Sequence, residues 1–226
     1  MDKSSKRYKE ALKLADPAKK YPLKEAISIL KQMPKIKFDE SVDLHLKLNV
    51  DSKNTEQAIR GTVVLPHGTG KKVKVAVFCK GEQEKEARDA GADFIGGQDL
   101  IDKVAGGFLD FDCAVATPEM MKDLSKLGKL LGPRGLMPSP KTGTVTMGVG
   151  KIIKELKAGK IEFKMDKQSG IHASVGKISF DEDKLIENAD SLLNAIRAAK
   201  PAAVKGQFID NISIASSMSP GLRLTL

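Results

Sequence analysis

The sequence has little of what membrane-embedded and disulfide-rich proteins need. Its longest unbroken apolar run is Val75 to Cys79, five residues, whereas a membrane-spanning helix needs about 20. The Lys-rich start, Met1 to Leu14, lacks the apolar stretch of a secretory signal. The two cysteines, Cys79 and Cys113, both lie in apolar, strand-like runs. We therefore expect no membrane contact, and buried, reduced thiols as found in the cytoplasm.

Aromatic residues are also scarce. They make up 4% of the 226 residues, with no Trp and two Tyr. Proteins that bind RNA by stacking its bases depend on exposed aromatic platforms, and with this composition we expect no such platform. If the chain binds RNA, we expect it to recognise the shape and backbone of a folded RNA through Lys, Arg and main-chain donors.

Positive charge is in excess, with 38 Lys and Arg against 29 Asp and Glu, a net charge of +9. This favours a polyanionic partner, because each cation near a phosphate releases condensed counterions. The alternative is a basic protein without such a partner, and charge alone does not separate the two.

Two kinds of predicted strand divide the chain. Residues 42–50 alternate apolar and polar side chains, which is typical of a strand with one solvated face. Strands 73–79 and 113–116 are instead continuous apolar runs separated by helices, as in a parallel sheet covered on both faces. The other expected strands are 63–65, 94–95, 161–165, 173–180, 208–214 and 222–226. The expected helices are 3–14, 23–33, 54–60, 82–90, 99–105, 119–131, 150–157 and 183–199, the last capped by Asp181.

Strands of one kind are expected to share a sheet. We therefore predict an α/β fold with two domains. Residues 1–66 plus 159–226 form an outer α+β split domain that contains both termini. Residues 67–158 form an inserted, doubly wound, Rossmann-like domain. The outer domain carries +6 of the net charge and the inserted domain +3.

A doubly wound domain suggests a nucleotide-dependent enzyme as the alternative function. Gly70-Lys71 resembles the end of a phosphate-binding loop, but Leu65 stands where the first glycine belongs and Lys72 where Ser or Thr would hold magnesium. The two candidate dinucleotide fingerprints have Ile153 and Val73 in place of their third glycine. We predict no nucleotide and no other cofactor.

Metal and nucleophile sites are equally poorly supported. His45, His67 and His172 are far apart, and none has a second ligand at metal-binding spacing. His45 is interpreted as a residue on the solvated face of a strand, and His67 as part of a turn. The paired carboxylates Asp39-Glu40 are interpreted as a solvated strand start. We therefore predict no metal site, no catalytic residues and no enzymatic activity.

Three stretches are unusual enough to suggest binding. Residues 35–40 combine lysines for phosphate, Phe38 for a base or ribose, and Glu40 as an acceptor for a 2′-hydroxyl or amino group; Phe38 could equally be a core residue. Within 126–143, the segment 132–143 is too rigid and too rich in Gly and Pro for a helix or strand, and long ordered loops of this kind are often functional. The last stretch, 216–221, places the apolar Met218 in a polar turn, where a core role is hard to arrange.

The stretch from Gly132 to Lys141 closely resembles the signature of the L-one family of large-subunit ribosomal proteins, which usually has Asn where Ser139 stands. Matching stretches extend along the whole chain: 37–40, 60–63, 65–68, 90–93, 171–173, 175–177 and 217–220. At the closing turn the family usually has threonine and glycine where Ser217 and Ser219 stand. Ser219 thus replaces a glycine, a residue that lets the backbone approach RNA closely.

The resemblance implies a two-domain cytoplasmic protein of the ribosome that is a monomer when free. It implies binding to folded large-subunit rRNA in the mobile stalk beside the tRNA exit site, help in releasing deacylated tRNA, and repression of translation of its own mRNA. It places the RNA surface on the outer domain. The matching positions are Lys37, Phe38, Glu40, Ser217, Met218 and Ser219, with Asp166 and His172 as weaker candidates.

Overall fold

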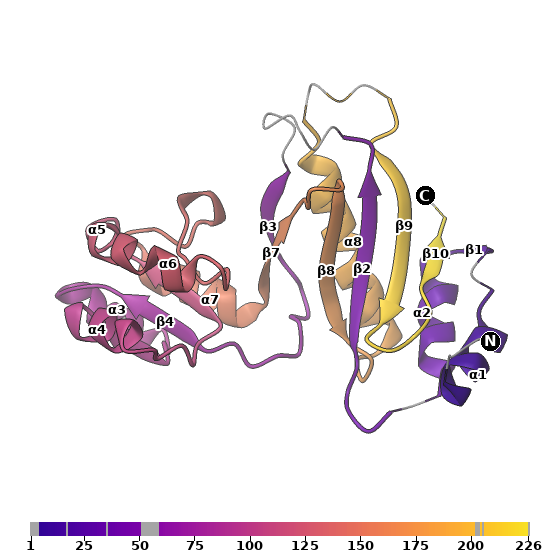
Figure 1. Ribbon diagram of the computed structural model, residues 1–226, viewed down its shortest axis with the longest axis horizontal. Coiled ribbons are helices and arrows are strands. Elements are labelled where there is room, and N and C mark those ends of the chain that lie inside the picture. The colour runs from indigo at the N-terminus through magenta and orange to yellow at the C-terminus, as the bar shows by residue number, and fades with distance from the viewer. Residues whose placement is uncertain are drawn as a thin grey trace. The chain divides into compact units, whose positions relative to one another are not determined.

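The computed structural model describes residues 5–16, 18–34, 36–50, 59–201, 204 and 206–225. It confirms a mixed α/β fold with several sheets (Figure 1). The chain divides into two compact units. Unit 1 comprises Met1–Gly70 and Ile161–Leu226, and unit 2 comprises Lys71–Lys160.

A five-stranded sheet forms the centre of unit 1. Its strands, in spatial order, are β1 (Lys20–Tyr21), β10 (Leu222–Leu224), β9 (Ile209–Ser216), β2 (Ser41–Leu48) and β8 (Gly170–Lys177). β1 pairs parallel with β10, and the other pairings are antiparallel. Strand β2 thus lies between two strands that come from the last third of the chain.

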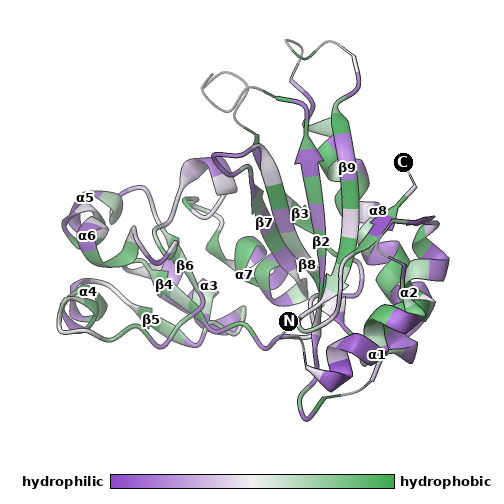
Figure 2. Ribbon diagram, turned by 45° about the vertical axis from the view of Figure 1, so that its right-hand side comes forward, coloured by the Kyte–Doolittle hydropathy of each residue, from purple (hydrophilic) through white to green (hydrophobic). Residues whose placement is uncertain are grey.

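Burial explains the alternating pattern of these strands. In β2 the side chains of Val42, Leu44, Leu46 and Leu48 are buried, while those between them face the other side. Figure 2 shows the same alternation along β9. The buried side chains pack with helices α2 (Leu23–Gln32) and α8 (Glu182–Ala198) in one core. Unit 1 also contains α1 (Lys6–Leu14) and a two-stranded sheet of β3 (Arg60–Val64) and β7 (Lys160–Lys164).

Unit 2 contains a three-stranded parallel sheet in the order β5 (Phe94–Gly96), β4 (Val75–Phe78), β6 (Cys113–Ala116). All four residues of β4 are buried, because separate cores lie on the two faces of this sheet. One core includes residues of α3 (Glu82–Asp89) and α7 (Val149–Ala158). The other includes residues of α4 (Gln98–Ala105), α5 (Met121–Leu124), η2 (Ser125–Leu127) and α6 (Gly128–Leu131).

Several local predictions differ from the structure. The helix predicted over 119–131 is three short pieces, α5, η2 and α6. A hydrogen bond from Ser125 Oγ to the Met121 carbonyl (2.8 Å) and a glycine at 128 both disfavour a continuous helix here. The 3₁₀ turn η3 (Pro140–Thr142) also lies in the stretch 132–143, where no helix is predicted.

Other differences concern ends of elements. Asp181 occupies the N-cap position of α8, but its side chain makes no capping bond and instead pairs with Lys184 at 2.8 Å. The helix predicted over 54–60 lies mostly outside the described residues, and its last residue, Arg60, begins strand β3. Cys79 is buried, which raises the pKa of its thiol to about 11, whereas Cys113 is only half-buried.

Candidate nucleic-acid interface

The structure brings the two main candidate stretches, 37–40 and 217–219, together at one edge of unit 1. Ser217 donates its backbone N–H to the carbonyl of Ser41 (3.0 Å), and the Ser41 N–H donates to Ser217 Oγ (3.1 Å). These residues are 176 positions apart in sequence. Antiparallel pairing of β2 with β9, with Val42 opposite Ser216, places the start of one strand beside the end of the other.

The buried side chain of Glu40 holds the 37–40 and 217–219 segments together. Its side chain is only 7% exposed, so its interpretation as part of a solvated strand start is wrong. The carboxylate accepts from Ser216 Oγ and from the backbone N–H of Met218, both at 3.1 Å. A buried carboxylate needs such donors, because without them its desolvation would be costly. The Glu40 carboxylate, predicted to accept hydrogen bonds from RNA, is therefore already used to hold the turn.

The serine hydroxyls of the closing turn are engaged in the same way. Ser217 Oγ accepts from the β2 backbone, and Ser219 Oγ accepts from the Ser216 N–H at 2.8 Å. The Ser219 N–H in turn donates to the Ser216 carbonyl at 3.2 Å. Ser219, at the position of the usual family glycine, thus closes the turn with its own hydroxyl.

Two apolar side chains project from this junction. Phe38 is 57% exposed and Met218 is 52% exposed. The open question of whether Phe38 is a core residue is therefore decided in favour of the surface. Lys37, beside Phe38, is exposed as well. The exposed cation of Lys37 matches the backbone recognition that the composition favours, and Phe38 and Met218 add two exposed apolar side chains that could contact a ribose or base.

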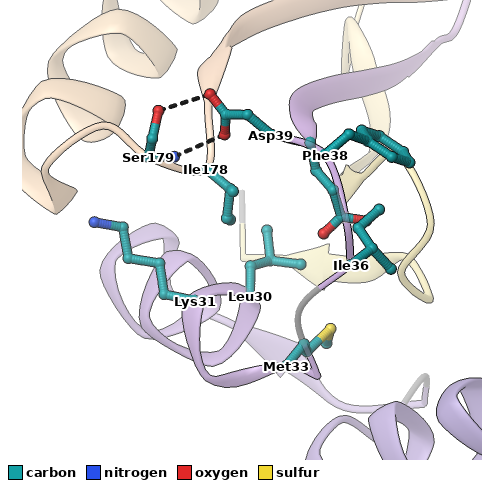
Figure 3. A pocket seen from close by; sticks show the side chains of 9 residues that line it. Leu30, Lys31, Met33, Ile36, Phe38, Asp39, Ile178 and Ser179 are labelled. Carbon is teal, nitrogen blue, oxygen red and sulfur yellow. Dashed lines mark hydrogen bonds between the residues drawn. The ribbon is translucent and has the colours of Figure 1, made fainter.

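A cavity of about 610 Å³ lies beside Phe38 (Figure 3). Apolar side chains from the end of α2, the 36–40 segment and the turn after β8 line most of it: Leu30, Met33, Ile36, Phe38 and Ile178. Asp39 stabilises one side of this cavity, because its carboxylate accepts hydrogen bonds from the Ser179 N–H (3.2 Å) and Ser179 Oγ (2.8 Å). The segment that carries Lys37 and Phe38 is thereby tied to the β8 turn.

Arg7 is a member of this site that the sequence did not reveal. Its Nη2 donates to the carbonyl of Met218 at 2.9 Å. The two residues are 211 positions apart, and Arg7 lies in a Lys-rich helical stretch like any solvated helix face. No local signal could have found this contact.

The weaker candidates, Asp166 and His172, lie near the other end of β2. Along β2, Ser41 is next to the closing turn, whereas Lys47 pairs with Gly170, the first residue of β8 and two residues before His172. Six strand residues separate these ends by about 20 Å. Asp166 Oδ1 accepts from the N–H groups of Gln168 (2.8 Å) and Gly170 (2.6 Å). The Gly170 bond, ahead of the other causes, lowers the pKa of Asp166, so its carboxylate shapes the β7–β8 turn.

His172 meets His45 across the β2–β8 pair. The two Nδ1 atoms are 2.9 Å apart, and the rings are edge to face with centroids 5.1 Å apart. Burial, followed by the charge of His172, lowers the pKa of His45, while Asp43 opposes this. Asp166 Oδ2 lies 3.6 Å from His172 Nε2. Strand register, not sequence spacing, creates this pair.

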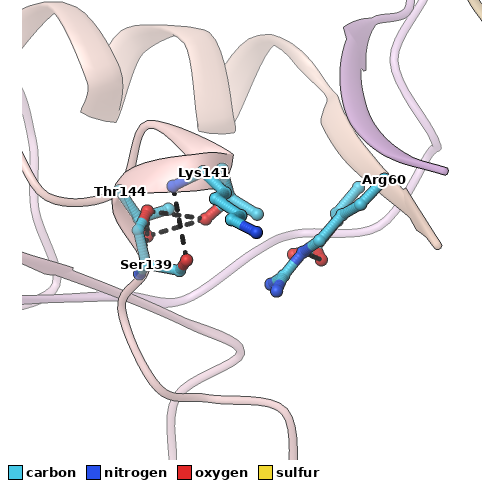
Figure 4. A network of polar contacts seen from close by, with 6 residues as sticks. Arg60, Ser139, Lys141 and Thr144 are labelled. Carbon is cyan, nitrogen blue, oxygen red and sulfur yellow. Dashed lines mark hydrogen bonds and ion pairs between the residues drawn. The ribbon is translucent and has the colours of Figure 1, made fainter. Parts of the chain in front are cut away.

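The Gly/Pro-rich stretch 132–143 belongs to unit 2 and is held by a compact network around Ser139 (Figure 4). The Ser139 carbonyl accepts from Thr142 Oγ1 (3.0 Å) and Thr144 Oγ1 (3.2 Å), and the Ser139 N–H donates to Thr144 Oγ1 (2.8 Å). Its hydroxyl accepts from the Lys141 N–H at 3.3 Å. Ser139 thus orders this loop where the related family usually has Asn.

Two findings concern the described residues as a whole. Among them, no group of three or more His, Cys, Asp or Glu side chains could hold a metal ion. No helix in the same part of the chain is long and apolar enough to cross a membrane.

The sequence is similar to those of known large-subunit ribosomal proteins. The sequence profile of the Ribosomal protein L1p/L10e family matches residues 30–220. Large ribosomal subunit protein uL1 of Protochlamydia amoebophila (strain UWE25) is 54% identical over 226 residues, 100% of this chain and 96% of the relative. The uL1 proteins of Kosmotoga olearia and Solidesulfovibrio magneticus are 53% and 52% identical over 224 residues, 99% of this chain and 97% and 95% of theirs.

Proposed function

The chain belongs to the Ribosomal protein L1p/L10e family, and from this premise we propose that it binds folded large-subunit rRNA through the edge of unit 1. It is a structural constituent of the large ribosomal subunit, and so a cytoplasmic protein, and it is not an enzyme. The RNA-binding surface proposed here consists of Lys37, Phe38 and Met218. Glu40, Ser217 and Ser219 shape it.

The observation that carries this proposal is the convergence of 37–40 and 217–219. Two segments separated by most of the chain meet through a buried carboxylate and leave two apolar side chains in solvent. Exposing Phe38 and Met218 gains nothing for folding. It is explained if both side chains lie against ribose or base surfaces when RNA is bound.

We further propose the role that the family resemblance implies for this RNA complex. The bound rRNA and protein form the mobile stalk beside the tRNA exit site and assist release of deacylated tRNA. A similar element in the protein's own mRNA is the second RNA target, whose binding represses translation. The outer domain, 1–66 plus 159–226, carries the RNA surface, and 67–158 is an inserted Rossmann-like domain. Asp166 and His172 form the far end of the proposed RNA surface.

Co-sedimentation tests the central claim. Large subunits lacking this protein are incubated with it at physiological salt and pelleted. We expect the wild-type chain to pellet with them and the Phe38→Ala, Met218→Ala double variant to remain largely in the supernatant. Circular dichroism controls for folding. Wild-type protein that is folded but does not pellet would refute a ribosomal role and leave a regulator that acts off the ribosome.

A further inference from the structure

The backbone of Met218 is held at both of its polar groups by side chains from distant parts of unit 1. Its N–H donates to Glu40 Oε1 at 3.1 Å, and its carbonyl accepts from Arg7 Nη2 at 2.9 Å. The partners lie 178 and 211 positions away in sequence. The peptide groups on both sides of an exposed side chain are therefore fixed by two oppositely charged side-chain groups.

Arg7 can act as a support because α1, on which it lies, is itself attached to the core. Ser5 caps the helix by accepting from the Tyr8 N–H at 3.3 Å. Ala11 and Ala15, each 1% exposed, pack into the core of unit 1. Beyond the helix, the Asp16 N–H donates to Tyr21 Oη at 3.0 Å and ties it to β1. The guanidinium thus extends from a fixed helix, and its rigid planar fork loses little entropy per bond formed.

The hydrogen bond from Arg7 to the Met218 carbonyl contributes little to the stability of the fold. It lies at the surface, where a hydrogen bond to a solvated carbonyl adds little stability because water can replace it. What it does is restrict the backbone that carries an exposed apolar side chain. Such restriction lowers the conformational entropy that a ligand must otherwise remove when it contacts that side chain.

We propose that Arg7 is a positioning residue for RNA recognition: from α1 it holds the closing turn so that Met218 is presented in its binding conformation. This inference rests on the proposed RNA-binding function. It assigns the N-terminal helix a role in the site without a contact between Arg7 and RNA. A direct contact of the Arg7 guanidinium with an RNA phosphate is the competing explanation.

A double-mutant cycle separates these explanations. Dissociation constants for a stalk rRNA fragment are measured for the full-length wild type, Arg7→Ala, Met218→Ala and the double variant. We expect Arg7→Ala to weaken binding about three- to tenfold, the size of one hydrogen bond expressed as a ratio of affinities. In the Met218→Ala background it should change affinity by less than about twofold, because the side chain it positions is gone. Additive effects would overturn the inference.

The salt dependence of RNA affinity also distinguishes a positioning residue from one that contacts a phosphate. A positioning residue leaves the slope of log affinity against log salt unchanged, whereas loss of a phosphate contact flattens it by about one. Lys6→Ala, which removes an exposed cation from the same helical turn, is the matched control for general charge. Arg7→Lys keeps the charge and a donor on a long chain, so we expect it to restore part of the affinity. A flattened slope for Arg7→Ala beyond that of Lys6→Ala would overturn the inference.

The methyl resonance of Met218 in the RNA-free protein provides a readout that does not depend on binding. In Arg7→Ala it should shift or change linewidth as the turn loosens, and in Lys6→Ala it should not. An unchanged resonance would contradict positioning. If the wild type binds the stalk fragment and Arg7→Ala binds equally well, only this inference fails. If the folded wild type does not bind at all, the proposed function fails.

Discussion

Replacing Met218 by alanine tests most directly whether the closing turn belongs to an RNA-binding surface. Met218 is 52% exposed in the free protein. Full burial of a methionine side chain contributes about 1.5–3 kcal/mol, so covering the exposed half with RNA is worth about 0.8–1.5 kcal/mol. We therefore expect Met218→Ala to weaken binding of a stalk rRNA fragment by roughly 4- to 12-fold.

The stability of the folded protein should change little in this variant. Surface substitutions usually cost within about 0.5 kcal/mol, which corresponds to a change in Tm of about 2 °C or less for a chain of this size. The backbone bonds to Glu40 and Arg7 involve the peptide groups and do not require the methionine side chain. Thermal unfolding followed by circular dichroism measures this directly.

Met147 in unit 2 provides a matched control. It is the same residue type, is 56% exposed, and lies outside the proposed RNA-binding unit. Met147→Ala should leave the dissociation constant within about twofold of wild type, a free energy change of under about 0.5 kcal/mol. Equal losses for both variants would refute a local site. Destabilisation of more than about 2 kcal/mol by Met218→Ala, as burial in a core requires, would make the methionine structural.

Three further outcomes are expected. Lys37→Ala should weaken all RNAs alike and lower the salt slope of binding by about one, and an unchanged slope would remove Lys37 from the interface. Asn188→Ala should cost about 2–3 kcal/mol in urea unfolding, because this fully buried amide makes three hydrogen bonds to the backbone; a cost below about 1 kcal/mol would contradict this. The pKa of His45 is depressed by burial and by His172. Its contribution to stability is therefore present above the unfolded-state pKa and lost as pH falls through the folded pKa. His172→Gln should raise the pKa of His45 in an NMR titration and flatten stability between pH 7 and 5, whereas an unmoved titration would show no coupling.

Periodicity in the sequence was sufficient for most of the secondary structure. The alternation along 42–50 identifies β2, because each side chain of a half-buried strand reports the face on which it lies. The apolar runs of β4 and β6 identify strands covered on both faces for the same reason. Prediction was weaker where local bonds decide, as in the helix predicted over 119–131, which Ser125 and Gly128 help to divide into three.

The candidate site could be predicted as a set of segments but not as a surface. The family resemblance identified 37–40 and 217–219 as RNA-binding segments. The composition, which is basic and has few aromatic residues, favoured an anionic partner that is not bound by base stacking. Sequence could not show that Glu40 is buried beneath the turn, or that the hydroxyls of Ser217 and Ser219 are engaged with backbone groups. A residue's type states which bonds it can make, and only its neighbours in space determine which of them it makes.

The sequence by itself determined the strand and helix pattern, the charge and the family, because burial periodicity and ordered motifs are properties of local chain order. Only the tertiary structure decided that Phe38 is exposed, that His45 faces His172, and that Arg7 reaches the Met218 carbonyl. These contacts join residues 127 to 211 positions apart, or depend on such contacts. They follow from strand register and helix docking, which the whole core fixes at once and no short stretch of sequence encodes.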